Sequence, residues 1–262
     1  MTRSLEGRIA LLTGAAGHLG RAMAEALAAA GAHVVLAGRR EVPLRDLESH
    51  LRGRGLHAST LVMDVTDAAS TAAGLKAIRA TRGKLHVLVN NAYAGSGGAV
   101  EDATDESFLA AYEVAVVGAF RLVRDGLPLL RAGFKDAGDA SVLNIASMYG
   151  TVSPDPVVYG DISPNPPSYG AAKGALLQLT RYLAVWLAPD SIRVNAISPG
   201  PFPAPEVVQQ APAFIAALRR KVPLGRMGEP ADLAGAVVFL ASPASAFVTG
   251  INLPIDGGWT AQ

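Results

Sequence analysis

The chain of 262 residues contains no cysteine. Disulfides, thiolate nucleophiles and zinc sites with cysteine ligands are therefore excluded, and redox chemistry has to come from a bound cofactor. The sequence also lacks any apolar run that approaches the roughly 20 residues needed to span a bilayer. Its five histidines show no metal-ligand spacing, so we expect no metal site.

A strong excess of charge is missing as well. The formal net charge is +1, which provides no general attraction to nucleic acid or to an anionic membrane. Residues 1–7 are polar and lack the basic and apolar regions of a secretory signal. We therefore expect a cytoplasmic protein whose partner is a small-molecule substrate.

What the chain does have is a regular alternation of short apolar runs and longer alanine-rich stretches of helical period. The runs predict strands at 8–13, 33–37, 58–63, 86–90, 141–146, 192–198 and 251–255. The stretches between them predict helices at 19–30, 44–52, 68–81, 105–131, 169–187 and 231–240. This order indicates an α/β, doubly wound Rossmann fold: a single domain over 1–262 with a seven-stranded parallel sheet flanked by helices on both faces.

A glycine-rich turn follows the first predicted strand. Residues 13–20 read Thr-Gly-Ala-Ala-Gly-His-Leu-Gly, and glycines here let backbone N–H groups and a helix N-terminus approach a pyrophosphate. Arg39 ends the second strand, where an acidic residue would bind the ribose 2′-hydroxyl of NAD and an arginine can pair with the 2′-phosphate of NADP. The sequence thus favours NADP(H) over NAD(H), while a plain surface role for Arg39 and Arg40 stays open.

A tyrosine and a lysine lie four positions apart on a predicted helix. Positions i and i+4 share a helix face, so we expect the ammonium of Lys173 to lie near the phenol of Tyr169 and to lower its pKa from about 10. Such a phenol can exchange a proton while a nicotinamide exchanges a hydride. Tyr159 competes for this role, but the residue four positions after it is Ser163, which carries no charge.

Several short motifs follow the ends of predicted strands in a fixed order: the glycine turn, Asp64-Val65, Asn90-Asn91-Ala92, Ser147, the Tyr169 and Lys173 pair, and Pro199-Gly200. In this order and placement they resemble the short-chain dehydrogenase/reductase family over essentially the whole chain. The sequence around 147–156 and 198–203 is most similar to the gluconate 5-dehydrogenase-like branch and to other sugar and polyol oxidoreductases.

The resemblance implies a role for each motif. Ser147 would polarise a carbonyl oxygen, Tyr169 would supply the proton, and Lys173 would assist it, which makes these three residues catalytic. Asn90 would steady the central strand. The cofactor would be bound by Gly14, Gly17, His18, Leu19, Gly20, Arg39, Asp64, Val65, Asn91, Ala92, Tyr169, Lys173, Pro199, Gly200 and Phe202.

Simpler roles stay open for some of these residues. Asp64 and Asn90 are also of the types that cap turns, and Ser147 would suit a plain turn hydroxyl. At the level of assembly, the resemblance implies a homotetramer formed through the helices predicted at 105–131 and 169–187.

Four positions depart from the family's pattern. His18 stands where a second glycine is usual, and Tyr93 replaces a glycine, which would place a phenol ring near the cofactor and the pocket. Ala115 replaces an asparagine that supports a water chain from the lysine, so proton relay has to run by another route, be slow or be absent. Ala204 replaces a threonine that holds the nicotinamide carboxamide, which leaves backbone groups after Gly200 for that task.

Two proline-rich segments, 147–168 and 199–222, follow predicted strands and are expected to form the loops of the substrate pocket. The first is longer than is usual in the family, since Tyr169 follows Ser147 by 22 positions. It contains four residues that would either bind substrate hydroxyls or lie exposed in turns: Tyr149, Asp155, Tyr159 and Asp161.

The expected activity is an NAD(P)-dependent interconversion of a secondary alcohol and a ketone, on a small polar substrate such as a sugar acid or polyol. A 3-oxoacyl carrier-protein or thioester reductase is the alternative, which the even charge balance disfavours. A catalytically silent NAD(P)-binding sensor or assembly subunit is an alternative of another class. The joint presence of Ser147, Tyr169 and Lys173 argues against silence.

Overall fold

The computed structural model describes residues 4–95, 97–160 and 162–262, and it is built around one sheet of seven strands. The strands are β1 (Ile9–Thr13), β2 (His33–Gly38), β3 (Ala58–Val62), β4 (Val87–Asn90), β5 (Ala140–Ile145), β6 (Ile192–Pro199) and β7 (Asn252–Ile255). They follow the order β3-β2-β1-β4-β5-β6-β7, and all neighbours are parallel. The predicted fold is confirmed. The strand order reverses between β1 and β4, and such a switch point is where an open sheet of this kind binds its ligand.

The central strands are buried throughout because helices cover both of their faces, and polar residues among them such as Asn144 and Arg193 are hydrogen-bonded. Every residue of β1, β4, β5 and β6 is buried, as a parallel sheet with two covered faces requires. The edge strands β3 and β7 are only partly buried. The burial pattern therefore explains why continuous apolar runs predicted these strands.

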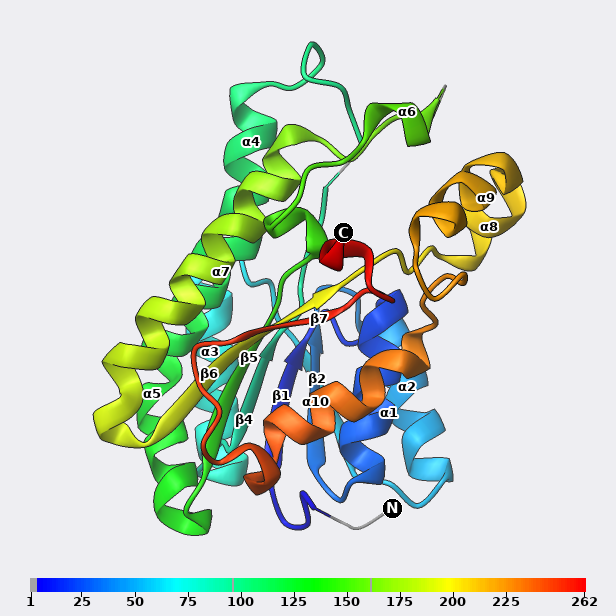
Figure 1. The fold of residues 1–262 in the computed structure, drawn as a ribbon. Helices are drawn as coiled ribbons and strands as arrows, with labels where there is room; N and C mark the ends of the chain where they lie inside the picture. The colour runs from blue at the N-terminus through cyan, green and yellow to red at the C-terminus, as the bar shows by residue number, and fades with distance from the viewer. Residues whose placement is uncertain (1–3, 96, 161) are drawn as a thin grey trace.

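Two helical layers enclose the sheet (Figure 1). One layer consists of α1 (His18–Ala29), α2 (Glu41–Gly53) and α10 (Ala234–Ala241), whose apolar residues share one core cluster with the sheet. The other consists of α3 (Ala68–Arg82), α5 (Gly118–Ala137) and α7 (Pro167–Leu187), which share a second cluster. Short turns of 3₁₀ helix complete the chain: η3 (Ala188–Asp190), η4 (Pro230–Leu233), η5 (Pro243–Ser245) and η6 (Trp259–Ala261).

The helix predicted at 105–131 is confirmed, but it is not uniform. A π-helical turn, η1 (Glu113–Val117), separates α4 (Asp105–Tyr112) from α5, which itself continues to Ala137. Turns of this kind often occur at functional sites. This one carries Ala115 with its side chain buried.

The two proline-rich segments form small helices beyond the carboxyl ends of the strands (Figure 1). The first contains η2 (Met148–Gly150) and α6 (Pro156–Tyr159), and the second contains α8 (Pro205–Gln210) and α9 (Pro212–Lys221). Val158 of α6 and Ile215 of α9 belong to one buried apolar cluster. The two segments thus pack on each other and form one structure above the sheet.

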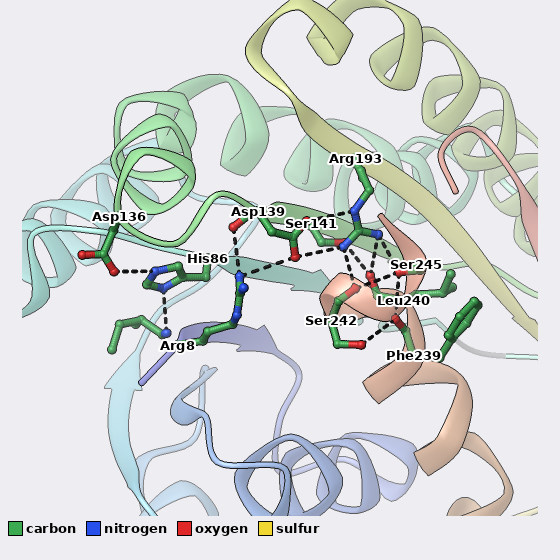
Figure 2. Close-up of polar contacts among 11 residues, drawn as sticks. Arg8, His86, Asp136, Asp139, Ser141, Arg193, Phe239, Leu240, Ser242 and Ser245 are labelled. Atoms are coloured by element: carbon green, nitrogen blue, oxygen red, sulfur yellow. Dashed lines mark hydrogen bonds and ion pairs between the residues drawn. The ribbon is translucent and has the colours of Figure 1, made fainter. Parts of the chain in front are cut away.

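A buried polar network joins the strands at their amino-terminal ends, opposite these segments (Figure 2). Arg193 donates to both carboxylate oxygens of Asp139, at 3.0 and 3.2 Å, and to Ser245 Oγ at 2.7 Å. Arg8 donates to the carbonyl of Asp139 at 3.0 Å. Because a buried charge is costly unless it is paired and hydrogen-bonded, this set of contacts strongly favours one arrangement of β1, β5 and β6.

Candidate active site

A cavity of about 580 Å³ lies at the carboxyl ends of the strands. It brings together residues from segments that are far apart in the sequence. Its lining includes all of the catalytic and cofactor-binding residues that the family resemblance implies: Gly14, Gly17, His18, Leu19, Gly20, Arg39, Asp64, Val65, Asn91, Ala92, Ser147, Tyr169, Lys173, Pro199, Gly200 and Phe202.

The glycine turn is held against the end of β4 by a close backbone approach. Gly14 has a φ of +63°, and a Cβ there would lie 2.9 Å from Asn91 Nδ2. Asn91 Nδ2 donates to the carbonyls of Thr13 and Gly14 at 2.9 and 3.1 Å. Thr13 Oγ1 accepts from the N–H groups of Asn91 and Ala92. Gly20 admits no side chain either, since a Cβ would collide with the carbonyl of Gly14. The N-terminus of α1 is thereby fixed at the cavity wall.

Arg39 and Asp64 lie on the far rim of the same cavity. Arg39 is exposed just after β2. Asp64 Oδ1 accepts from the N–H and the hydroxyl of Thr66 at 2.9 and 2.8 Å. Burial opposes ionisation of this carboxyl, but the Thr66 bonds and the Arg39 charge outweigh it and lower its pKa. Asp64 therefore caps a turn, the role that the sequence left open, and also lines the cavity.

Ser147, Tyr169 and Lys173 converge at the inner end of the cavity. Ser147 lies two residues after the end of β5 and caps η2, where its Oγ accepts from the N–H of Tyr149 at 3.2 Å. Tyr169 lies in the first turn of α7 and Lys173 one turn later. The Nζ of Lys173 donates to the carbonyl of Ile145 at 2.6 Å, and only 3% of the residue is exposed.

The pKa of Tyr169 differs from the sequence-based expectation. Burial raises it, and this effect outweighs a hydrogen bond with Ser147, which lowers it. Burial also lowers the pKa of Lys173 to about 8. The expected lowering of the Tyr169 pKa by Lys173 is not found, because Nζ points to the Ile145 carbonyl and lies 5.8 Å from the centre of the Tyr169 ring.

Tyr93 is the residue whose importance the sequence only partly indicated. It lines the cavity, as its position suggested. Its ring also meets that of Tyr169 edge to face, with centroids 4.9 Å apart and an interplanar angle of 73°. The Nζ of Lys173 lies 5.2 Å from the centre of the Tyr93 ring. No feature of the sequence pattern predicted these two contacts, since they depend on how β4 and α7 meet.

The candidate substrate-binding residues of the first proline-rich segment have protein partners. Tyr149 and Tyr159 are buried and share a hydrogen bond of 3.0 Å between their hydroxyl oxygens. Asp155 forms an ion pair with Lys221 of α9. These three polar groups therefore join parts of the protein to one another, and the expectation of exposed turn residues is wrong for the two tyrosines. Asp161 lies outside the described residues.

Asn90 and Ala115 border a second, small cavity behind Lys173. Its volume is about 10 Å³, which suits about one water molecule. Asn90 Nδ2 donates to Asn144 Oδ1 on the neighbouring strand at 2.8 Å. The Oδ1 of Asn90 is buried and has no hydrogen-bond partner among the residues that the structure describes. Asn90 thus links β4 to β5 beside the lysine.

A family model described as enoyl-(acyl carrier protein) reductase matches residues 14–260. The chain belongs to the short-chain dehydrogenase/reductase family. This protein is an oxidoreductase that acts on CH–OH donors, as the names of its relatives and structural neighbours indicate. The model's description names one reaction of a large family, and the similar proteins differ in theirs.

Three similar proteins illustrate this range. Trans-4-hydroxycyclohexanecarboxylate dehydrogenase of Sinomonas cyclohexanicum is 36% identical over 97% of this chain and 93% of the relative. The rhamnolipids biosynthesis 3-oxoacyl-[acyl-carrier-protein] reductase of Pseudomonas aeruginosa is 33% identical over 98% and 97%. The structure of a gluconate 5-dehydrogenase from Burkholderia cenocepacia in complex with NADP and tartrate is 31% identical over 99% and 98%, with a TM-score of 0.88.

Neither a metal site nor a membrane span is found in the described part of this short-chain dehydrogenase/reductase. No group of three or more histidine, aspartate or glutamate residues in 4–95, 97–160 and 162–262 is placed to hold a metal ion. Within the same ranges, no helix has the length and hydropathy needed to cross a bilayer.

Proposed function

We propose that this protein interconverts a secondary alcohol and a ketone on a small polar substrate of the sugar-acid or polyol class, with NADP(H) preferred over NAD(H). The observation that carries the proposal is that Ser147, Tyr169 and Lys173 line the same cavity as the glycine turn and Arg39. A proton-transfer group and a dinucleotide site thus share one space.

The cavity fits a nicotinamide dinucleotide by shape and by chemistry. Gly14 and Gly20 let the backbone and the N-terminus of α1 approach a pyrophosphate closely. Gly200, which also lines the cavity, packs closely against Asp256, because a Cβ there would lie 2.6 Å from the Cα of that residue. Arg39 offers a guanidinium to a 2′-phosphate. When bound, the nicotinamide supplies or accepts the hydride.

The side chains of the protein supply binding and the proton. Ser147 Oγ is placed to donate to the carbonyl oxygen, and the Tyr169 hydroxyl to give that oxygen its proton or to take it back. Because burial opposes ionisation of Tyr169, positive charge has to offset it. Lys173 would provide this charge only if its Nζ turned from the Ile145 carbonyl, to which it donates in this structure, towards the Tyr169 hydroxyl.

Support for the substrate class comes from the similar proteins and from the pocket loops. The gluconate 5-dehydrogenase structure contains tartrate, a small hydroxy acid. In this chain the proline-rich segments 147–168 and 199–222 pack together above the cavity through Val158 and Ile215, and we assign them as the walls of the substrate pocket. The cytoplasmic location and the homotetramer stay predictions of the sequence.

One observation favours a second candidate function, reduction of 3-oxoacyl groups on a carrier protein. The last turn of α9 is basic, with Arg219, Arg220 and Lys221 beside the pocket loops. Carrier proteins are acidic, and a basic patch would attract them. Lys221, however, is already paired with Asp155, which leaves two of the three charges for such a partner.

The test is an absorbance assay with purified protein, NADPH or NADH, and three classes of carbonyl compound: keto derivatives of sugar acids, ketoses and acetoacetyl thioesters. We expect loss of the nicotinamide absorbance with the keto sugar acids and NADPH. Turnover of the thioesters alone would establish the second candidate. Complete inertness with intact cofactor binding would favour the silent sensor and contradict the proposal.

A further inference from the structure

Lys173 is a buried cation with few polar partners in the described part of the chain. Its Nζ donates one hydrogen bond, to the carbonyl of Ile145 at 2.6 Å. The rest of its surroundings includes two aromatic rings, with centres 5.2 Å away for Tyr93 and 5.8 Å away for Tyr169. A cation over an aromatic ring is stabilised by the ring quadrupole, and more so where water is excluded. The position of Lys173 therefore depends on the placement of these two rings.

Tyr93 is held by contacts that are independent of any substrate. It packs against a small buried cluster that is formed by Ala115 and Val116 of η1 and Ala172 of α7. Ala115 and Ala172 are both almost completely buried, with 3% and 1% exposed. Each of these alanines contributes only a methyl group to the cluster against which Tyr93 packs. The ring of Tyr93 then meets Tyr169 edge to face.

We propose that Tyr93 is a positioning residue, which holds Lys173 and the Tyr169 ring in their observed places at the cavity, and that the small side chain of Ala115 allows the ring of Tyr93 to occupy its position. The inference rests on the proposed function for its kinetic meaning. Tyr93 acts here through two other side chains and needs no contact with the substrate.

The ring of Tyr93, and not its hydroxyl, carries this role. Burial is the main cause that raises the pKa of Tyr93 to about 12, and the neighbouring Tyr169 adds to it. The hydroxyl therefore stays protonated at any working pH. Its oxygen is buried and has no hydrogen-bond partner among the described residues. Removing the hydroxyl should therefore change little, whereas removing the ring should release Lys173.

Steady-state kinetics of Tyr93→Phe and Tyr93→Leu provide the first test. Tyr93→Phe keeps the ring, and its kcat should stay within about 3-fold of the parent. Tyr93→Leu should lower kcat by about 10- to 100-fold, because small misplacements of reacting groups have effects of this order. The substrate KM and the cofactor Kd should change by less than about 3-fold, in line with a loss confined to the transition state. Phe134→Leu, which removes a partly buried ring near the end of α5, is the matched control.

NMR of lysine-labelled protein provides a test that needs no turnover. The chain has only five lysines, so the Lys173 side chain can be assigned by comparison with Lys173→Arg. We expect its ε-methylene protons to be shifted upfield by the two rings. Most of this shift should disappear in Tyr93→Leu and persist in Tyr93→Phe and Phe134→Leu.

The role of Ala115 is tested by a double-mutant cycle. Ala115→Leu should lower kcat in the parent, because the larger side chain displaces the Tyr93 ring. In the Tyr93→Leu background the same change should have an effect at least about 5-fold smaller, since no ring is left to displace. Equal effects in the two backgrounds would overturn this part of the proposal.

The outcomes separate the positioning role from the proposed function. If the parent turns over none of the carbonyl compounds, the proposed function fails, and the Lys173 resonance alone decides whether Tyr93 holds the lysine. An unchanged kcat and an unmoved resonance in Tyr93→Leu would overturn the positioning role. A rise in KM with kcat unchanged would overturn it too, since this result would make Tyr93 a substrate contact.

Discussion

Tyr149 and Tyr159 share a hydrogen bond of 3.0 Å between hydroxyl oxygens that both lie within the first proline-rich segment. Tyr149 comes two residues after Ser147, whereas Tyr159 ends α6. The ring of Tyr159 lies 5.1 Å from that of Phe214 on α9. This bond therefore connects the backbone beside the candidate catalytic serine to both walls of the pocket.

Removing the Tyr159 hydroxyl should loosen the pocket. Tyr159→Phe leaves the buried hydroxyl of Tyr149 without this partner, which costs about 1–3 kcal/mol. We expect a lower free energy of unfolding in urea and a KM several-fold higher, with a smaller effect on kcat. Tyr112→Phe, at a more exposed tyrosine of α4, is the control. A stability and a KM equal to those of the parent would show that the bond has no such role.

Arg39 should determine the cofactor preference. Arg39→Asp replaces the guanidinium by a carboxylate that repels a 2′-phosphate and accepts from a 2′-hydroxyl. A hydrogen bond to a charged group contributes about 1.5–3 kcal/mol, so kcat/KM with NADPH should fall by about 10- to 100-fold while the value with NADH is kept or rises. Arg45→Ala, an exposed arginine paired with Glu41 on α2, should leave the ratio unchanged. If Arg39→Asp also leaves the ratio of kcat/KM with NADPH to kcat/KM with NADH unchanged, other residues determine the cofactor preference.

Tyr169→Phe should abolish proton transfer without disturbing the site. The substitution removes one oxygen from a partly buried residue and keeps its ring contact with Tyr93. General acid catalysis contributes about 10²- to 10⁴-fold, and we expect kcat to fall by this order. Binding of NADPH, followed by fluorescence, should be retained. Turnover at the parent rate would remove Tyr169 from the chemistry altogether.

His86 should make the stability of the fold depend on pH. Its Nδ1 accepts from the N–H of Ile9 at 2.9 Å, and its Nε2 lies 3.1 Å from Asp136 (Figure 2). Burial lowers the pKa of His86 below its usual 6.5, although the bond with Asp136 opposes this. As the pH falls, His86 is therefore protonated at a higher pH in the unfolded chain than in the folded one. The free energy of unfolding that His86 contributes above pH ~6.5 is lost as the pH falls towards the lower pKa of the folded state.

Urea unfolding between pH 8 and pH 5 measures this loss. His33 contributes in the same direction, because burial and then the Arg82 charge lower its pKa to about 4. His86→Gln should therefore reduce the slope of stability against pH in this window without abolishing it, and His33→Gln should remove a further part. A slope unchanged by His86→Gln would contradict the assignment.

Much of the fold could be predicted from the sequence because its elements are determined locally. The strands β1 and β4 are apolar up to their last residue, and the glycine turn is where a positive φ and a close approach are required. The π-helical turn at Glu113–Val117 could not be predicted in this way. Its residues are mostly apolar and contain no glycine or proline to mark a break, and only packing against the rest of the protein determines it.

In the candidate site, too, the features that are determined locally could be predicted from the sequence and those that depend on packing could not. The spacing of Tyr169 and Lys173 correctly placed both on one helix at one cavity. The direction of the pKa shift of Tyr169 depends on burial, and burial depends on side chains from other segments. The contacts of Tyr93 with both residues and the pairing of Tyr149 with Tyr159 are likewise long-range, so spacing along the chain carried no information about them.

The ion pairs of Asp139 with Arg8 and Arg193 lie at the end of the sheet that faces away from the cavity. They help to hold the strands in place without help from the loops above the cavity. A change of loop sequence at the cavity end therefore leaves these ion pairs at the opposite end of the sheet intact. This separation suits the chain to directed evolution, in which an exposed part of the pocket loops such as α8 (Pro205–Gln210), which has no buried residue, is randomised to obtain new substrates while the folded scaffold is kept.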